Sequence, residues 1–342
     1  ASRWLADLGD LETAIAHALE ADDPELAAGI IENRRKELML RENWPLLSRL
    51  LNSLPQSIVA QRPVLLVVKA WERRAVADFT AVDSILDRVE AALSIQSGLV
   101  DETVESELRG EIAWLRAFQG FYSGDFEQAI AFCHEAYEKI PPDRPLYATI
   151  RQTEAFSLQG LGKIDQATQL VQQAIESRLD QTNVNLETDW YTLFTVNYLA
   201  GKWVEAERVA LNYITLFGNQ SANPVLNAAF YILGVIYYEW NALDNALYYF
   251  GLVIKEHVYD LSYQDGFFSL ALCHQVSGHP EKANQLLNEM ENFIGSTRRA
   301  HLLTGLEAMR ARKALMSGNR KVAILWANSV VLGPVSYTHL TL

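Results

Sequence analysis

The chain has 342 residues, of which 49% are apolar and 21% charged, and its formal net charge is -13. This length exceeds that of a typical single core, so we expect two domains or one extended array. The acidic balance argues against direct nucleic-acid binding by this segment, because phosphate backbones attract basic surfaces. The only cysteines, Cys133 and Cys273, are too few for a disulfide framework, which indicates a cytoplasmic location.

No stretch of the sequence predicts a membrane span. The longest strongly apolar run, Val64 to Val68, is stopped by Lys69 and falls far short of the roughly 20 residues that a spanning helix needs. The N-terminus begins at Ala1, without an initiator Met and without a signal-peptide pattern. We therefore expect the chain to be a piece of a longer protein.

Residues 1–100 have helical spacing without a regular repeat. Asp10 and Asp22-Asp23-Pro24 mark helix starts, and a short helix in "WPLLSRLLNSLP" should end at Pro55. Another helix opens after Gln61-Arg62-Pro63, and Ala77-Asp78-Phe79 is interpreted as a degenerate copy of the turn described next. We predict that this region is irregular and helical, and that it links to an upstream domain.

Six segments share one signature: a turn residue, a polar residue, an apolar or variable residue, a polar or acidic pair, and Ala. The turn residues lie 37 to 40 residues apart, and they are Gly124, Gly162, Gly201, Asn241, Gly278 and Gly318. Such a period is typical of a solenoid, in which each unit buries its apolar face against its neighbours. Gly or Asn permits the turn, acidic residues favour the next helix start, and Ala permits close helix approach.

The unit "AFYILGVIYYEWNALDNALYYFGLVI", residues 229–254, resembles the tetratricopeptide repeat. The motif's core falls on Phe230, Leu233, Gly234 and Tyr237, and its close-packing Ala falls on Ala246. The other units match less well. We predict an all-α fold, a right-handed superhelix of antiparallel helical hairpins, with the repeat array over residues 101–333.

The order of segments, from "ASRWLADLGDLETAIAHALE" through "RGEIAWLRAFQGFYSGDFEQAI" to "LGVIYYEWNALDNAL", resembles the central region of large ATP-dependent LuxR-type regulators. That family includes a maltotriose-responsive activator of the maltose regulon. The resemblance implies an upstream ATPase, a repeat superhelix that receives the inducer, and a downstream helix-turn-helix. This chain has no G-x-x-x-x-G-K-[ST] phosphate loop, so ATP is expected only in the upstream domain and no cofactor in this chain.

Aligning the repeats on their turn residues defines two rows of residues on the first helix of each hairpin. In tetratricopeptide arrays this helix lines the concave surface. The first row is Trp114, Gln152, Tyr191, Tyr231 and Phe268, and the second is Phe121, Gln159, Tyr198, Tyr238 and Gln275. Aromatic and amide side chains can bind a sugar or a peptide. The alternative is that these residues form the core between repeats.

The sequence carries no pattern that predicts catalysis or metal binding. The doublets Cys133-His134 and Cys273-His274 cannot chelate well by themselves, because adjacent residues on a helix point about 100° apart. Packing or surface roles explain them better. No nucleophile elbow is present, and the acidic residues at helix starts are explained by capping. We predict that this chain is not an enzyme and holds no metal.

We interpret the chain as a sensor and interaction domain that binds an inducer or a regulatory protein and signals to its own upstream ATPase domain. One alternative is a generic scaffold for protein segments. Another is a set of repeats that regulates an enzyme fused to them. The sequence does not identify the inducer.

The last residues, "PVSYTHLTL" at 334–342, continue no helical register. They match the translation of a transposase end sequence used in sequencing adaptors. We predict that this segment is a non-native tail and exclude it from the fold, with a β-prone tail or a peptide motif as the alternative.

Overall fold

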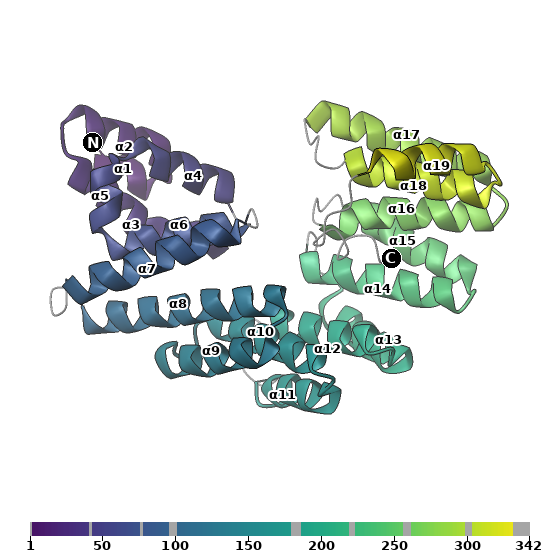
Figure 1. Cartoon of the computed structure of the whole chain (residues 1–342), viewed down its shortest axis with the longest axis horizontal. Coiled ribbons are helices and arrows are strands. Elements are labelled where there is room, and N and C mark those ends of the chain that lie inside the picture. Colours follow the sequence, from purple (N-terminus) through teal and green to yellow (C-terminus); the bar gives the residue numbers. More distant parts are fainter. Residues whose placement is uncertain are drawn as a thin grey trace. The chain divides into compact units, whose positions relative to one another are not determined.

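The computed structural model describes residues 2–40, 43–75, 78–95, 101–178, 186–218, 223–255, 261–297 and 303–330. These residues form nineteen α-helices and no strand, which confirms the predicted all-α hairpin fold (Figure 1). The chain divides into two compact units, residues 1–189 and 190–342. The two units are defined by packing contacts alone. The predicted boundary near residue 100, between a linking region and the repeat array, stays a prediction. The segment 334–342 and Ala77 lie outside the described residues.

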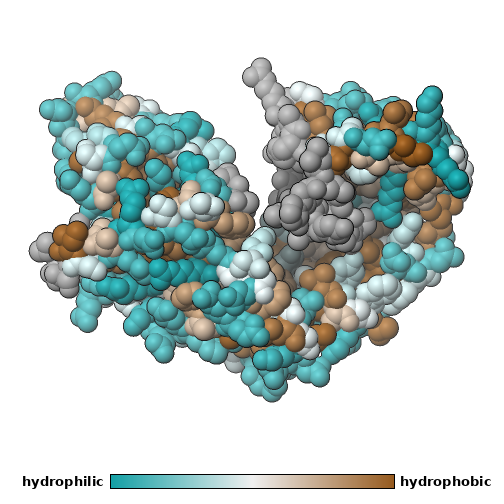
Figure 2. Space-filling model, in the orientation of Figure 1, coloured by the Kyte–Doolittle hydropathy of each residue, from teal (hydrophilic) through white to brown (hydrophobic). Residues whose placement is uncertain are grey.

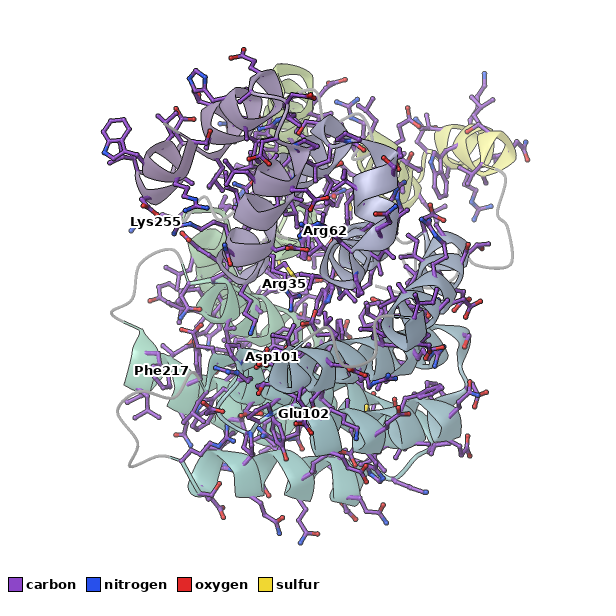
Figure 3. The ribbon with its side chains drawn as sticks, turned by 90° about the vertical axis from the view of Figure 1, so that its left-hand side faces the viewer. Arg35, Arg62, Asp101, Glu102, Phe217 and Lys255 are labelled. Carbon is purple, nitrogen blue, oxygen red and sulfur yellow. The ribbon has the colours of Figure 1, made fainter. Side chains whose placement is uncertain are left out.

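Unit 1 (residues 1–189) contains the irregular region and the first two hairpins of the repeat. Its helices are α1 (Ser2–Asp7), α2 (Leu11–Glu20), α3 (Pro24–Leu40), α4 (Trp44–Ser53), α5 (Gln56–Gln61), α6 (Pro63–Ala75), α7 (Phe79–Ile95), α8 (Glu102–Ser123), α9 (Phe126–Lys139), α10 (Pro145–Gly160) and α11 (Ile164–Glu176). The predicted helix boundaries near Pro24, Pro55 and Pro63 are confirmed. Asp101 and Glu102 mark the start of α8 in Figure 3, where the Asp101 side chain caps the helix.

Unit 2 (residues 190–342) contains the remaining hairpins. Its helices are α12 (Glu187–Leu199), which begins just before the boundary, α13 (Trp203–Phe217), α14 (Pro224–Glu239), α15 (Leu243–Lys255), α16 (Leu261–Val276), α17 (Pro280–Thr297), α18 (Leu303–Met316) and α19 (Arg320–Ser329). None of the helices in the described part of the chain is both long and apolar enough to cross a membrane.

All six predicted turn residues adopt the left-handed conformation that the signature requires. Their φ angles lie between 58° at Asn241 and 83° at Gly124. The same conformation recurs at Gly9 and Asp22, each followed five residues later by a fully buried alanine, Ala14 and Ala27. The irregular region therefore contains two more copies of the turn, which the sequence alignment missed because their spacing is short.

Small residues let the two helices of each hairpin approach closely. The signature alanines of the first five repeat hairpins have no exposed surface: Ala129, Ala167, Ala206, Ala246 and Ala283. The predicted contact position Gly234 lies so close to Phe250 that a Cβ atom there would stand 2.5 Å from the ring. These contacts orient the first helices of the hairpins, which carry the predicted site residues.

Buried ion pairs connect distant helices of unit 1. Arg35 of α3 is 4% exposed, and its guanidinium donates to both carboxylate oxygens of Glu111 on α8, at 2.8 and 3.0 Å. The indole of Trp71 on α6 donates to the same carboxylate at 3.0 Å. Figure 3 shows Arg35 among the N-terminal helices. Because a buried carboxylate needs its partners, this group fixes α3 and α6 against α8.

Candidate functional site

The first helix of each repeat hairpin presents three positions on one face. These positions lie ten, six and three residues before the turn residue, which is the i, i+4, i+7 spacing of one helical stripe. On α14 they hold Tyr231, Val235 and Tyr238. The two predicted rows are the first and third of these positions. The position between them was not part of the prediction.

In unit 2 these positions surround a cavity of about 210 Å³. Its wall is mainly aromatic and aliphatic, with hydroxyl, carboxylate and guanidinium groups among the apolar side chains. The lining residues are Tyr198, Trp203, Tyr231, Val235, Tyr238, Glu239, Phe250, Ser269, Leu272 and Arg312. An apolar wall with a few polar groups is the usual composition of a small-ligand site.

The three tyrosines of the cavity keep their hydroxyl groups protonated. Burial raises the pKa of Tyr231, and Asp265 acts in the same direction. Burial also raises the pKa of Tyr198, together with Glu239, and that of Tyr238. A neutral phenol both donates and accepts hydrogen bonds. The cavity therefore offers three such groups beside one carboxylate, Glu239, and one guanidinium, Arg312.

Of the predicted site residues in unit 2, the structure brings Tyr198, Tyr231 and Tyr238 together in this cavity. The other three lie elsewhere. Tyr191 is half-buried with its ring 5.6 Å from that of Phe194, and Phe268 is 6% exposed and packs in a core cluster. Gln275 donates from Nε2 to the hydroxyl of Ser317 at 3.2 Å. A ligand role for these three stays a prediction.

In unit 1 two of the predicted residues, Trp114 and Phe121, pack against aromatic rings outside the predicted set. Trp114 is 1% exposed, stacks on Trp71 with centroids 4.4 Å apart, and donates to Thr153. For Trp114 the structure therefore favours the alternative role of core residue. Phe121 is half-buried, and its ring lies 6.1 Å from that of Phe156 on α10.

Gln152 and Gln159 are both half-buried on α10. Neither lines the cavity of unit 2. A ligand role for Phe121, Gln152 and Gln159 stays a prediction.

The prediction missed several lining residues, and one signal could have found three of them. Val235, Leu272 and Arg312 each stand six residues before a turn residue, on the stripe between the two predicted rows. Adding this position to the rows would have included Val235 and Leu272, and including Arg312 would also have required extending the rows to the sixth hairpin. Ser269 and Glu239 directly follow predicted positions, and only the structure shows that they face the cavity.

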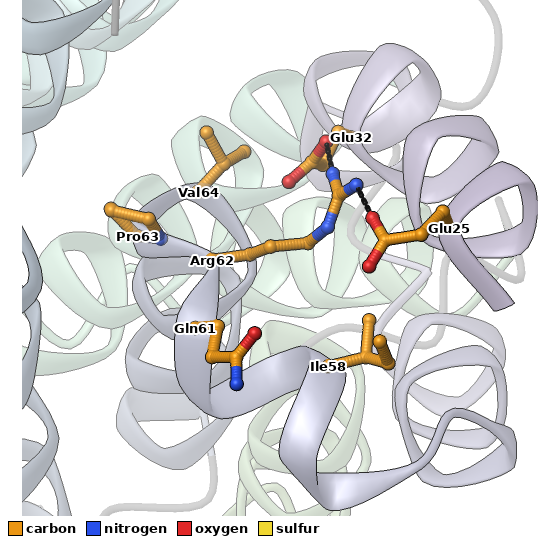
Figure 4. Close-up of a pocket in the computed structure, with 7 residues that line it drawn as sticks. All are labelled: Glu25, Glu32, Ile58, Gln61, Arg62, Pro63 and Val64. Atoms are coloured by element: carbon orange, nitrogen blue, oxygen red, sulfur yellow. Dashed lines mark hydrogen bonds and ion pairs between the residues drawn. The ribbon is translucent and has the colours of Figure 1, made fainter. Parts of the chain in front are cut away.

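Unit 1 has a cavity of its own, of about 340 Å³, between α3 and the junction of α5 and α6. Arg62 binds Glu25 and Glu32 across it, with 2.6 Å to Glu32 (Figure 4). Burial raises the pKa of Glu32, against the opposing effect of Arg62. Because the charged groups already satisfy one another, we interpret this cavity as structural.

The Cys-His doublets occupy ordinary packing and surface positions. Cys133 and Cys273 are both fully buried, and burial raises the pKa of Cys273 to about 12. His134 contacts Glu154 at 3.0 Å. Among the described residues, no group of three or more His, Cys, Asp or Glu side chains could hold a metal ion.

Stacked helical hairpins with left-handed turns and close-packing alanines define the class of tetratricopeptide-type repeat proteins. Comparison with solved structures agrees with this class. The Rap protein complexed with Competence and Sporulation Factor matches with a TM-score of 0.56 at 15% identity, over 89% of this chain and 86% of that chain. This likeness concerns the fold alone.

The family follows from the sequence. Residues 110–341 match the model of the MalT-like TPR region, and the chain belongs to this family. The HTH-type transcriptional regulator MalT of Serratia proteamaculans is 33% identical over 141 residues, which cover 41% of this chain and 15% of that protein. MalT of Cronobacter sakazakii is 23% identical over 346 residues, covering 95% of this chain. The chain spans 36% of the length of that relative.

Proposed function

We propose that this chain is the non-catalytic sensor domain of a signal-transducing ATPase that regulates transcription. In this proposal an inducer binds the cavity of unit 2, and a regulatory protein that contacts the same surface is the second candidate partner. The observation that carries the proposal is the meeting of Tyr198, Tyr231 and Tyr238 in one cavity. Membership in the MalT-like TPR region supports it, because the named relatives are transcriptional regulators.

The composition of the cavity suits a small polar ligand that has an apolar face. The rings of Trp203 and the three tyrosines provide contact area, while Ser269, Glu239 and Arg312 can orient hydroxyl groups. A protein segment could insert a side chain into the same space. The ligand would act by population shift: it would favour the conformation of the whole regulator that it binds better, and so pass its occupancy to the upstream ATPase.

Isothermal titration calorimetry of the chain with maltotriose tests the proposal, with maltose and glucose as comparisons. The triple variant Y198F/Y231F/Y238F keeps the rings and removes the three hydroxyls. We expect maltotriose affinity to fall at least about tenfold, since each lost hydrogen bond contributes about 0.5–1.5 kcal/mol. Tyr122→Phe, which changes a 60% exposed side chain in unit 1, is the matched control and should bind as the wild type does.

Equal affinity of the wild type and the triple variant would remove the cavity from the proposal. Absence of binding by the wild type would reject the small-sugar form of it. A pull-down with and without small metabolites then separates the regulatory-protein form from the generic scaffold.

A further inference from the structure

A cluster of aromatic rings lies on unit 2 outside the cavity. Figure 2 shows hydrophobic residues among the hydrophilic ones on one face of the molecule; Tyr and Trp lie near the middle of its scale, so ring contacts and exposure, not this colouring, define the cluster. The cluster consists of Tyr237 and Trp240 at the end of α14 and Tyr248 and Tyr249 on α15, and we call it the aromatic platform. Trp240 is 40% exposed and Tyr248 is 62% exposed.

The rings of the platform meet in one stacked pair and two perpendicular pairs. Tyr237 and Tyr249 stack with centroids 5.5 Å apart and planes 12° apart. Trp240 stands at 77° to Tyr237, and Tyr248 at 77° to Tyr249. Perpendicular rings beside a stacked pair form the partial walls that cations occupy when they bind aromatic side chains.

A carboxylate stands beside these rings. Glu207 on α13 is half-buried, and its Oε1 accepts from the Tyr237 hydroxyl at 2.5 Å. Glu207 also raises the pKa of Tyr249, after the larger effect of burial and that of Tyr248, so its charge acts on both stacked rings. The nearest basic group on the same helix, Arg208, is engaged by Glu205. The platform thus combines ring faces with negative charge, and both attract a cation.

In unit 1 a comparable cluster of aromatic rings contacts an arginine of the chain itself. There the guanidinium of Arg74 lies between 4.9 and 5.9 Å from the ring centroids of Trp44, Trp71, Trp114 and Phe118. Of the described arginines found over rings, Arg74, Arg116 and Arg151, none lies over the platform of unit 2.

We propose that the aromatic platform, with Glu207, docks an arginine side chain of a partner protein. The guanidinium would stack on the exposed rings and donate to the Glu207 carboxylate, as planar guanidinium groups do at interfaces. A protein segment is the occupant rather than a small free cation, because the platform has exposed rings and lines neither of the cavities described above. The exposed Val204, at the start of α13, offers apolar contact for the same segment, and the net charge of -13 favours a basic partner.

The test uses the full chain labelled with 5-fluorotryptophan, and the W240F variant assigns the ¹⁹F signal of Trp240. The probes are a Leu-Arg-Val-Arg-Leu peptide and its match with citrulline, which has the shape of arginine without its charge. We expect the Trp240 signal to shift with the arginine peptide. The affinity for the citrulline peptide should be lower by at least about fivefold.

Two variants make the test specific. Glu207→Gln keeps an acceptor for the Tyr237 hydroxyl and should lose at least about fivefold in affinity for the arginine peptide. Glu281→Gln, which changes an exposed glutamate on α17 outside the platform, is the control and should bind normally. Tyr248→Ala truncates an exposed ring and should weaken binding without loss of helicity. Equal binding of the two peptides, or unchanged binding by both Glu207→Gln and Tyr248→Ala, would overturn the proposal. Maltotriose affinity in Glu207→Gln reports separately on the cavity.

Discussion

The two units place similar residues on the first helices of their hairpins and use them differently. In unit 1 the stripe of α8 holds Trp114, Phe118 and Phe121, whose rings pack against neighbouring rings and, for the first two, around Arg74. In unit 2 the stripe of α14 holds Tyr231, Val235 and Tyr238, and these line a cavity. The same positions thus form core where large rings meet, and they line a cavity where smaller or polar residues alternate with the rings.

The two units also differ in how deeply their ion pairs are buried. Unit 1 buries ion pairs, among them Arg35 with Glu111 and Arg151 with Asp189, the latter at 2.6 Å. In unit 2 the ion pairs of Arg208 with Glu205 and of Arg310 with Glu291 lie at its surface. We infer that unit 1 is specialised for a fixed geometry and unit 2 for binding.

The largest expected effect follows from breaking the central ion pair of unit 1. Glu111→Ala leaves the buried guanidinium of Arg35 without its charged partner and takes the acceptor from the Trp71 indole. We expect a loss of about 3–5 kcal/mol in the free energy of unfolding, measured by urea denaturation. The control, Glu105→Ala on the same helix, breaks a more exposed pair with Arg109 and should cost less than about 1 kcal/mol. Similar losses for the two variants would show that the buried pair does not hold unit 1 together.

A smaller effect is expected from crowding the helix contact behind the cavity of unit 2. In Gly234→Ala the new methyl group would meet the Phe250 ring, which also lines the cavity, so Phe250 must move. We expect the free energy of unfolding to fall by about 1–3 kcal/mol. The affinity for maltotriose should fall as well. Gly251→Ala on α15 adds a methyl group where no atom lies within 4 Å, and it should be neutral or stabilising by up to about 1 kcal/mol. If Gly234→Ala matched Gly251→Ala in both measurements, the close approach of α14 and α15 would be of no consequence.

The smallest expected effect concerns the pH dependence of stability, to which two glutamates of unit 1 should contribute with opposite sign. Burial alone would raise the pKa of Glu107, but Lys36 and Arg144 more than offset it, so the pKa is lowered. Its stabilising contribution is present above the unfolded value of about 4.3 and is lost as the pH falls through the folded value. Burial raises the pKa of Glu32, so its contribution is present below the unfolded value and lost as the pH rises through the folded value.

Urea titrations of Glu107→Gln and Glu32→Gln between pH 7 and pH 3 measure this difference. On acidification the wild type should lose stability relative to Glu107→Gln and gain it relative to Glu32→Gln. The same trend for both variants would contradict these opposite pKa shifts.

Much of the fold was predictable because the turn chemistry is local. A left-handed turn residue and an alanine five residues later identify each hairpin, so the six turns of the regular array and the all-α fold were predicted and are confirmed. The turns at Gly9 and Asp22 were missed because irregular spacing hides them from an alignment by period.

The candidate site was predictable only in part. The rows gave Tyr198, Tyr231 and Tyr238, which share a stripe and a cavity. They also gave Trp114, whose burial depends on the neighbouring Trp71, a contact between helices of low sequence similarity. Arg312 and Ser269 come from later hairpins, and their place in the cavity depends on how successive hairpins stack, which single repeats do not encode.

Hydrogen–deuterium exchange of the chain with and without maltotriose tests the central claim most directly, because it shows which unit responds to the ligand. If the cavity of unit 2 is the sensor, backbone amides of α14, α16 and α18 should be protected when the ligand is bound, and those of α6 and α8 in unit 1 should be unchanged. The Y198F/Y231F/Y238F variant should lose the protection. Protection confined to α6 and α8 would contradict the assignment of sensing to unit 2.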